Sequence, residues 1–271
     1  MRRFLKFFAR LSALLLGLSL CLSPLRGFAA YNFEYERAVG NPLKGFMPFY
    51  SPDGADDSVP YSMEWFYIPL SALISDSGEY TVREGLEPYL EAISARGNQA
   101  VFRVYLDYPG SDIGEKAVPR FIWDMGIKKE RYDEYGGGFC PDYSDGRLID
   151  ILCDFVRELA REYDGDRRIA YITTGLLGHW GEWHVCLPEL EATNEQKAKI
   201  ISAFAQSFKV TRILTRYPGT PGTTRKGNVG FHDDSFTHST LYDESWHFMA
   251  KMKKARQTGV WKNQPIGGEF R

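Results

Sequence analysis

The sequence predicts an α/β protein of the (β/α)8 TIM-barrel type, and three observations support this fold class. Apolar runs rich in β-branched and aromatic residues alternate with amphipathic helical stretches, which is the pattern of repeated βα units around a parallel sheet. The units recur about every 30 residues, and roughly 240 residues remain after the N-terminal segment, a length that one barrel often occupies. Polar residues directly follow several apolar runs, at the strand ends where barrels place their sites.

Residues 1–30 are predicted to be a signal peptide. Arg2, Arg3 and Lys6 form a basic region ahead of an apolar stretch over 11–20, and small residues around Ala29 suit cleavage. The apolar stretch is shorter than the about 20 residues that a membrane span needs. We therefore expect a secreted, periplasmic or cell-surface protein with no stable membrane span, in which residues 31–271 form one (β/α)-barrel domain. Lipid anchoring at Cys21 is not expected, because the residue before it is a large leucine.

The hydrophobic pattern and the helix-capping residues predict where the helices and strands lie. Capping boxes at Thr81 and Thr193, and an N-cap at Ser144 or Asp145, predict where three helices begin. A fourth helix is expected over about 242–257. Residues 107–143 are predicted to be a long loop without structure of its own, of the kind that forms lids and binding loops. The expected strands are 45–50, 63–69, 100–106, 169–174, 212–217, 228–231 and 265–270.

This count stops at seven strands. Because no eighth βα unit follows in the sequence, we expect a barrel that is truncated after strand seven or closed in another way.

Composition excludes several function classes. The net charge is −2, and lysines and arginines are scattered, so no nucleic-acid partner is expected. No dinucleotide loop, phosphate-binding loop or nucleophile elbow is present, and no cofactor is predicted. Aromatic residues make up 15% of the chain, and several stand beside Gly, Pro, His and Asp. This distribution suits a cleft in which sugars stack, although large cores also use aromatics.

Three cysteines follow the signal peptide. Cys153 lies on the apolar face of a predicted helix and is expected to be a buried thiol. Cys140 and Cys186 lie in loops after two predicted strands, and the sequence leaves open whether they form a disulfide.

Glu182 is the strongest candidate for a catalytic acid/base. It follows the strand over 169–174, in the segment Gly178-His-Trp-Gly-Glu-Trp-His184. We expect its glycine and tryptophan neighbours to desolvate the carboxyl group partly, which favours the protonated form that a general acid needs. The alternative is a glutamate in a solvated loop.

Glu269 holds the equivalent place on the last predicted strand, about three βα units of roughly 30 residues beyond Glu182. On a closed barrel the two carboxylates would face each other across the mouth. Retaining glycosidases separate such carboxylates by about 5–5.5 Å and inverting ones by about 6.5–9.5 Å, and the sequence leaves both open. The alternative is that Glu269, near the end of the sequence, is frayed.

This placement resembles that of the acid/base and the nucleophile in the clan-A glycoside hydrolases. Three motifs, Asn41-Pro-Leu-Lys-Gly-Phe46, the Glu182 segment and Gly267-Gly-Glu-Phe-Arg271, more closely resemble an uncharacterised bacterial family of exported barrel proteins, usually followed by a β-rich domain. The resemblance implies a (β/α)8 fold and hydrolysis of glycosidic bonds. The sequence departs from the clan-A pattern at Gly181, where an asparagine would normally bind the sugar 2-hydroxyl.

Other polar or aromatic residues near strand ends are candidates for substrate binding. Arg103 is equally suited to a structural ion pair, Asp233 and Asp234 to loop caps, and the tryptophans to packing. The candidates are Arg103, Tyr105, Asp107, His179, Trp180, Trp183, His184, Arg216, His232, Asp233 and Asp234.

The leading hypothesis is a glycoside hydrolase that acts on an extracytoplasmic carbohydrate, with Glu182 and Glu269 as its paired carboxylates. A non-catalytic carbohydrate-binding barrel is the first alternative. A metal-assisted hydrolase that uses His179, His184 and His232 is the second. Its spacing, His-x-x-Glu-x-His, is not the zinc-protease motif, and no metal ligand is assigned.

Overall fold

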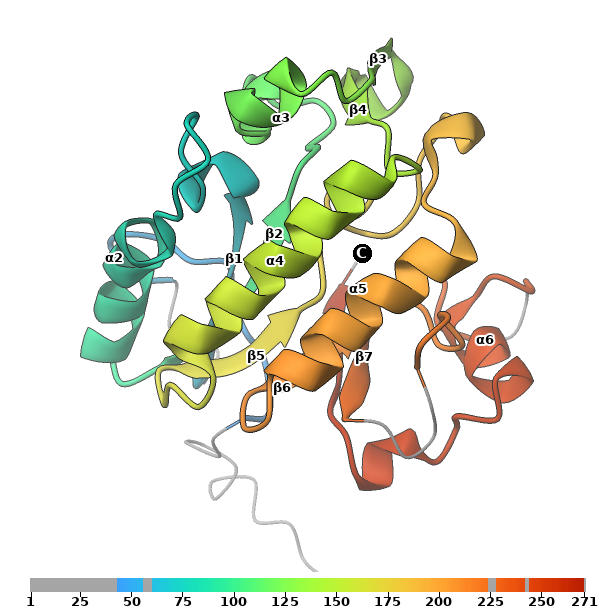
Figure 1. Cartoon of the computed structure of the whole chain (residues 1–271). Helices are drawn as coiled ribbons and strands as arrows, with labels where there is room; N and C mark the ends of the chain where they lie inside the picture. Colours follow the sequence, from blue (N-terminus) through green and yellow to red (C-terminus); the bar gives the residue numbers. More distant parts are fainter. Residues whose placement is uncertain (1–42, 56–59, 224–227, 242–243, 271) are drawn as a thin grey trace, which may run out of the picture. The chain divides into compact units, whose positions relative to one another are not determined.

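The protein contains one parallel sheet of six strands in the order β1-β2-β5-β6-β7-β8 (Figure 1). The structure is a computed structural model that describes residues 43–55, 60–223, 228–241 and 244–270, so the expected signal peptide lies outside the described residues. The sheet is an open half-barrel of the TIM-barrel kind, which confirms the predicted fold class. Its strands are β1 (Met63–Pro69), β2 (Gln99–Tyr105), β5 (Ile169–Thr173), β6 (Arg212–Thr215), β7 (Val229–Phe236) and β8 (Ile266–Phe270).

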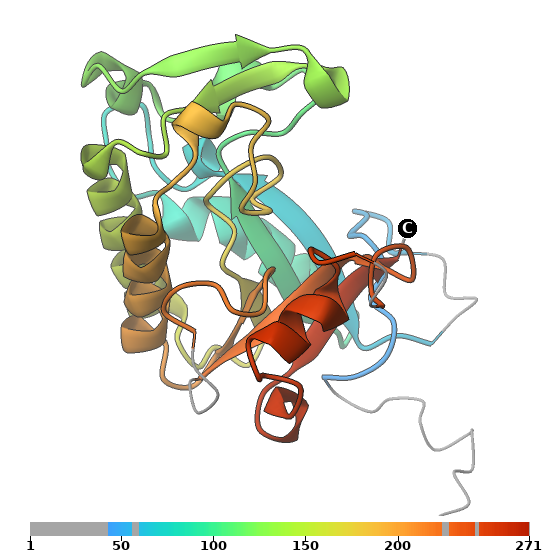
Figure 2. The same cartoon turned by 90° about the vertical axis from the view of Figure 1, so that its right-hand side faces the viewer.

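Helices connect the strands, and a separate antiparallel hairpin joins β3 (Lys129–Tyr132) to β4 (Gly138–Pro141). Figure 2 shows this hairpin in green, away from the parallel sheet. The α-helices are α2 (Val82–Ala95), α3 (Arg120–Asp124), α4 (Gly146–Tyr163), α5 (Asn194–Ser207) and α6 (Phe248–Lys254). Short 3-10 helices are η2 (Leu70–Ala72), η3 (Gly114–Ala117), η4 (Glu134–Gly136), η5 (Pro188–Leu190) and η6 (Val260–Lys262).

The side chains along each strand alternate between two environments, because successive side chains point to opposite faces of a sheet. On β1, Phe66 and Ile68 belong to the large core beneath the helices, while Trp65 packs in a separate cluster on the concave face. On β2, Phe102 joins the large core and Val101 joins the concave cluster. Side chains that share the register of Trp65 and Val101 therefore face the interior of the half-barrel.

Helices α4 and α5 lie side by side over the sheet (Figure 1). Asp145 caps α4 by accepting a hydrogen bond from the Arg147 amide at 2.8 Å. Thr193 forms the predicted capping box with Gln196 at the start of α5. These caps satisfy amides that have no partner within a helix, and they confirm two of the three predicted helix starts.

The third predicted capping box, at Thr81, does not form. The Thr81 hydroxyl instead contacts the Ala72 carbonyl oxygen at 3.5 Å, and the Thr81 side chain makes no capping hydrogen bond. Packing of α2 against η2 draws this hydroxyl away from the helix amides.

The expected strand over 45–50 is wrong as a continuous strand. Its residues form only isolated parallel bridges, from Phe46 to Tyr61, which precedes β1, and from Phe49 to Trp65 in β1. Gly45 has a φ of +99°, and Pro48 has no amide hydrogen to donate, so a regular ladder cannot extend through the segment.

Two further predictions need correction. The segment 107–143 is not an unstructured loop, because it contains η3, α3 and the β3–β4 hairpin. The last helix is shorter than predicted, and α6 begins only at Phe248. Its first amides donate to the Ser239 and Thr240 carbonyl oxygens, so the preceding chain takes the place of another helical turn.

None of the helices in the described part of the chain is long and apolar enough to span a membrane.

A cavity of about 570 Å³ lies on the concave face, between the segment 43–49 and residues 264–270. Trp65, Tyr171 and Leu214 line it from the sheet, and Glu269 lines it from β8.

Gly85 marks the tightest approach between α2 and η2. A Cβ atom at this position would lie 2.3 Å from the Ala72 carbonyl oxygen. We predict that Gly85→Ala lowers the free energy of unfolding by about 1–3 kcal/mol, although alanine is intrinsically the better helix former. Gly146→Ala in α4 is the matched control, because a Cβ there meets nothing within 4 Å. Chemical denaturation of both variants measures the difference, and equal stability would contradict the prediction.

Candidate active site

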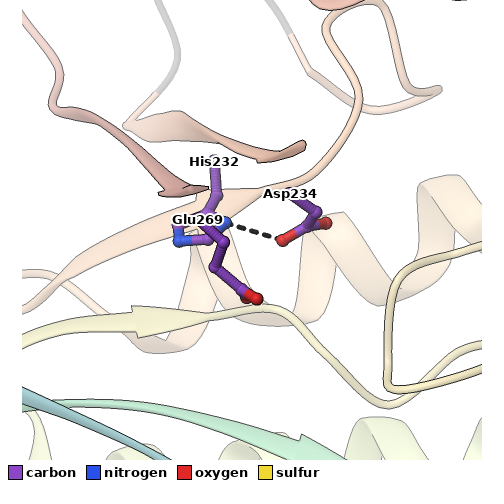
Figure 3. Close-up of side chains that lie close together, drawn as sticks. All are labelled: His232, Asp234 and Glu269. Atoms are coloured by element: carbon purple, nitrogen blue, oxygen red, sulfur yellow. Dashed lines mark hydrogen bonds and ion pairs between the residues drawn. The ribbon is translucent and has the colours of Figure 1, made fainter. Parts of the chain in front are cut away.

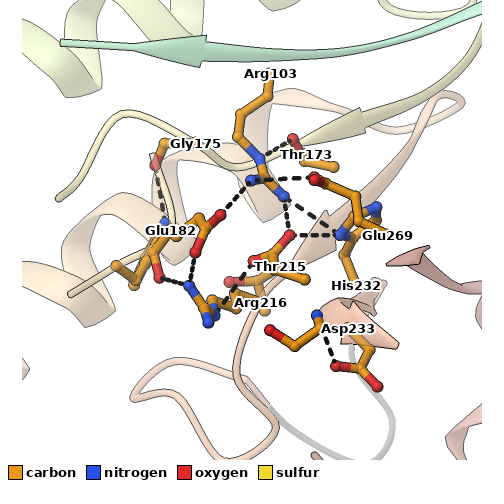
Figure 4. A network of polar contacts seen from close by, with 12 residues as sticks. Arg103, Thr173, Gly175, Glu182, Thr215, Arg216, His232, Asp233 and Glu269 are labelled. Carbon is orange, nitrogen blue, oxygen red and sulfur yellow. Dashed lines mark hydrogen bonds and ion pairs between the residues drawn. The ribbon is translucent and has the colours of Figure 1, made fainter. Parts of the chain in front are cut away.

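The carboxyl ends of the strands bring a polar network together on the concave face (Figure 4). This is where barrel enzymes hold their sites, because side chains from different strands converge there. The network takes Arg103 from β2, Thr173 from β5, Glu182 from the loop after β5, Arg216 from directly after β6, His232 and Asp234 from β7, and Glu269 from β8.

Arg103 is the centre of this network, and it is only 1% exposed. Its Nη2 pairs with Asp234, and its Nε donates to Thr173 Oγ1 at 3.1 Å. Its Nη1 lies 3.9 Å from Glu182 Oε1 and 3.6 Å from Glu269 Oε1. Burial opposes the charge of Arg103, but the acidic groups around it raise its pKa above the ordinary value. The guanidinium group therefore remains positive.

Glu182 and Glu269 thus approach the same guanidinium nitrogen from different parts of the chain. Their Oε1 atoms can be no further apart than the two distances to Arg103 Nη1 combined, about 7.5 Å. This bound covers the separation of about 5–5.5 Å in retaining glycosidases and part of the inverting range of about 6.5–9.5 Å. The two predicted carboxylates therefore belong to one site.

Asp234 is buried beside His232 and two arginines. Its Oδ1 lies 2.7 Å from His232 Nδ1, and its Oδ2 lies 3.3 Å from Arg216 Nε. Burial alone would raise the pKa of Asp234, but Arg103, His232 and Arg216 hold it well below its usual range. The His232 ring stacks on Trp65, with 4.9 Å between the ring centroids. Asp234 is therefore a charged partner of Arg103, not a loop cap.

Glu182 has polar partners as well as aromatic neighbours. It is 3% exposed, pairs with Arg216 Nη1, and lies 3.3 Å from His184 Nε2. The expected desolvation is present, but two guanidinium groups and an imidazole surround the carboxylate. Trp183 was expected to shield Glu182 from water. It instead packs in the core and donates its Nε1–H to the Gly175 carbonyl oxygen at 2.8 Å.

The loop that carries Glu182 has an unusual backbone. Leu176, Trp180 and Trp183 adopt φ angles of 65°, 51° and 66°, which side chains other than glycine rarely adopt. Glycine is required at Gly178, where a Cβ would lie 2.4 Å from the His184 carbonyl oxygen. Such conformations persist only where surrounding contacts enforce them.

His179 supplies those contacts. Its Nδ1 lies 2.6 Å from Asp107 Oδ2, and its Nε2 accepts a hydrogen bond from the Cys186 amide at 2.9 Å. Asp107 Oδ1 also accepts from the Tyr132 hydroxyl at 2.6 Å. The His179 carbonyl oxygen in turn accepts from the Glu182 amide at 2.8 Å. His179 and Asp107 are both buried, so they join β2, the hairpin and the Glu182 loop.

Glu269 is the more accessible carboxylate, with 19% of its side chain exposed. Its Oε1 accepts from the Tyr67 hydroxyl at 2.7 Å. Burial raises the pKa of Glu269 above its ordinary value, and Arg103 only partly opposes this. Glu269 therefore holds a proton to higher pH than an exposed glutamate.

The remaining candidates for substrate binding lie partly in the polar network and partly around it. Trp180 packs against Tyr135, with 5.4 Å between centroids, and Tyr105 packs against Tyr108 at 5.1 Å. Burial raises the pKa of Tyr105 to about 12, so its hydroxyl stays protonated at neutral pH. Asp233, near the end of β7, accepts hydrogen bonds from the Ser235 amide and the Thr240 hydroxyl, and it thereby holds the turn that follows the strand.

Sequence reasoning missed Tyr67 and Tyr132. Tyr67 lies two residues beyond Trp65, so strict alternation along β1 would have placed it on the same concave face. Tyr132 had no such signal, because it lies on a hairpin that the sequence pattern did not reveal.

All three cysteines in the described residues are free thiols. Cys140 and Cys153 are buried, while Cys186 is half-buried. Burial raises the pKa of the Cys186 thiol to about 11, which favours the protonated and less reactive form.

Potential metal ligands come together at His232, Asp234 and Glu269, whose donor atoms all lie within 4.8 Å of one another (Figure 3). Arg103 forms ion pairs with both carboxylates, so a fixed positive charge already balances them. This arrangement disfavours a divalent cation at the same place. The metal-binding set predicted from the sequence was His179, His184 and His232. His179 is not available to a metal, because both of its ring nitrogens are engaged in hydrogen bonds.

The chain has a TIM-barrel-like fold, and solved structures of an endo-glycoceramidase share that fold at low sequence identity. No family model and no curated protein matches the sequence. Endo-glycoceramidase II from Rhodococcus sp., as its lactosyl-enzyme intermediate, matches with a TM-score of 0.53 and 15% identity, covering 83% of this chain and 64% of that chain. Its complex with a five-membered iminocyclitol gives 0.51 and 13%, with the same coverage. The chain thus spans less than two thirds of that enzyme's length.

We predict that Asp107→Asn lowers the free energy of unfolding by about 2–3 kcal/mol, because it removes a buried charge-assisted partner of His179. Tyr132→Phe should cost only about 1 kcal/mol, since it removes one neutral donor and leaves the Asp107–His179 contact intact. Denaturant titration gives both values, and amide exchange across 175–186 locates the effect. Equal losses in the two variants would show that His179 does not depend on Asp107.

Proposed function

We propose that the protein is an extracytoplasmic glycoside hydrolase with Glu182 and Glu269 as its catalytic carboxylates. The observation that carries this proposal is the approach of both side chains to Arg103 Nη1, at 3.9 Å and 3.6 Å. Two carboxyl groups at this spacing can act on opposite sides of a glycosidic bond. The glycoside hydrolase-like fold supports a carbohydrate ligand.

In the proposed reaction Glu182 donates a proton to the glycosidic oxygen as the bond to the leaving group breaks. For a retaining enzyme, ionised Glu269 attacks the anomeric carbon and forms a glycosyl ester, and water activated by Glu182 then cleaves that ester. In the inverting alternative, Glu269 as general base would activate the attacking water directly. Either route requires Glu182 to carry a proton, so its ion pair with Arg216 must loosen when substrate binds.

The motifs quoted above support a place in the uncharacterised bacterial family of exported barrel proteins. Export follows from the basic and apolar pattern of residues 1–30. Because the chain spans 64% of the length of the Rhodococcus enzyme, the sugar and linkage are not carried over from that protein.

A carbohydrate-binding barrel without catalysis is the second candidate, and two observations favour it. Arg216 and Arg103 both form ion pairs with Glu182, so this carboxyl group is already engaged by other side chains. Gly181 also stands where clan-A enzymes normally carry an asparagine. In this case sugars would bind at the same aromatic and charged surface without being cleaved.

We predict that Glu182→Gln and Glu269→Gln each lower kcat/KM on a cleaved glycoside by at least about 100-fold, because each removes an acid, base or nucleophile. Glu189→Gln, an exposed residue of η5, is the matched control and should leave activity unchanged. Thermal unfolding must show that the variants fold. Sugar binding with no hydrolysis by the wild-type protein would favour the binding barrel.

We predict that Tyr67→Phe moves the acidic limb of the pH–rate profile to higher pH. The Tyr67 hydrogen bond lowers the pKa of Glu269, so its loss raises that pKa further above the ordinary value. Catalysis needs ionised Glu269, and activity would therefore be lost at a higher pH as the solution is acidified. An unchanged acidic limb would indicate that Glu269 does not set it.

A further inference from the structure

Two cations lie over one aromatic ring beside the candidate active site. The guanidinium carbon of Arg216 lies 4.8 Å from the Tyr217 ring centroid, and Lys251 Nζ lies 4.7 Å from the same centroid. Tyr217 follows Arg216 directly after β6, and Lys251 comes from α6. We call Arg216, Tyr217 and Lys251 the basic corner.

The charges in the basic corner are unequally balanced. Arg216 pairs with Glu182 and Asp234, and the nearby Lys197 pairs with Glu191. Lys251, by contrast, forms no ion pair with any carboxylate in the described part of the chain, and its ammonium group contacts only the ring of Tyr217 among the interactions found there.

The surroundings of Lys251 are positive as well as partly buried. Burial lowers the pKa of Lys251, and the charges of Lys254, Lys197 and Arg216 lower it further. At neutral pH Lys251 therefore contributes repulsion to the folded state. An anion placed beside Lys251 would be attracted by its unbalanced charge and would relieve that repulsion.

The basic corner adjoins the candidate active site. Arg216 belongs to both, because its Nη1 pairs with Glu182 while its guanidinium group lies over the ring of Tyr217. Lys197 lines a small recess together with Trp183 and His184, on the loop that carries Glu182. A sugar held at Glu182 could therefore extend a substituent toward the basic corner.

We propose that the basic corner is a subsite for an oxyanion on the substrate, so that the protein acts on an acidic glycan that carries a carboxylate or a sulfate group. Arg216 and Lys251 both lie over the ring of Tyr217, and Lys251 supplies the unbalanced charge. This inference rests on the proposed function for its substrate, but binding of an anion at Lys251 does not require hydrolysis.

Thermal unfolding with inorganic sulfate tests the subsite directly, with sodium chloride at equal ionic strength as the reference. Sulfate should raise the Tm of the wild-type protein, and Lys251→Met should bind it about three- to tenfold more weakly, the loss expected for one partly exposed charge. Lys253→Met on the same helix is the matched control, because Lys253 is exposed and is not among the cations that act on Lys251. Without sulfate, Lys251→Met should raise the Tm, since it removes repulsion. An equal response to sulfate in wild type and Lys251→Met overturns the proposal.

Titration with glucuronate, a sulfated monosaccharide and neutral glucose separates the subsite from catalysis. Tighter binding of either acidic sugar, lost in Lys251→Met and kept in Lys253→Met, supports the subsite and identifies the anion. If that pattern holds while the wild-type protein cleaves no glycoside, the proposed hydrolase fails and the subsite stands. If glycosides are cleaved but acidic and neutral sugars bind alike in all three proteins, the hydrolase stands and the subsite fails.

Discussion

A permanently charged guanidinium group buried on the concave face of the sheet is the constraint on which the site depends. Arg103 cannot lose its proton and is almost wholly removed from water, so the fold must supply negative charge around it. Asp234, Glu182 and Glu269 meet that requirement from three separate parts of the chain. The same ion pairs that balance Arg103 therefore hold the two candidate catalytic carboxylates in one place.

The second constraint is the backbone of the Glu182 loop. Its left-handed residues would be unstable in isolation, and the loop keeps its shape because buried His179 joins it to Asp107 and to the Cys186 amide. The hairpin contributes through Tyr132, which shares the Asp107 carboxylate. A segment that would otherwise be a mobile connection thus becomes a fixed support, and catalysis and selective binding both need that rigidity.

The sequence was informative where a local pattern matches a local structure. Alternation of apolar runs predicted all six strands of the parallel sheet, and capping signals placed the starts of α4 and α5 correctly. It was less informative where distant contacts decide the outcome. The Thr81 hydroxyl contacts the Ala72 carbonyl oxygen instead of capping α2, and the strand over 45–50 is interrupted at Pro48. For Glu182, position after a strand was sufficient to predict a place at the strand ends, but its pairing with Arg216 depends on the register of two strands that are far apart in sequence.

Arg103 also couples the two carboxylates, because one guanidinium group is shared between Glu182 and Glu269. The positions of the two carboxylates are therefore linked through the side chain of Arg103. In the proposed glycoside hydrolase, this shared contact keeps the two carboxyl groups within reach of one glycosidic bond. Within the described residues, the contacts that join this network come from β1, β2, the loop after β5, the end of β6, β7 and β8. In the proposed function, the cavity beside Glu269 is the route by which a sugar would reach the two carboxylates.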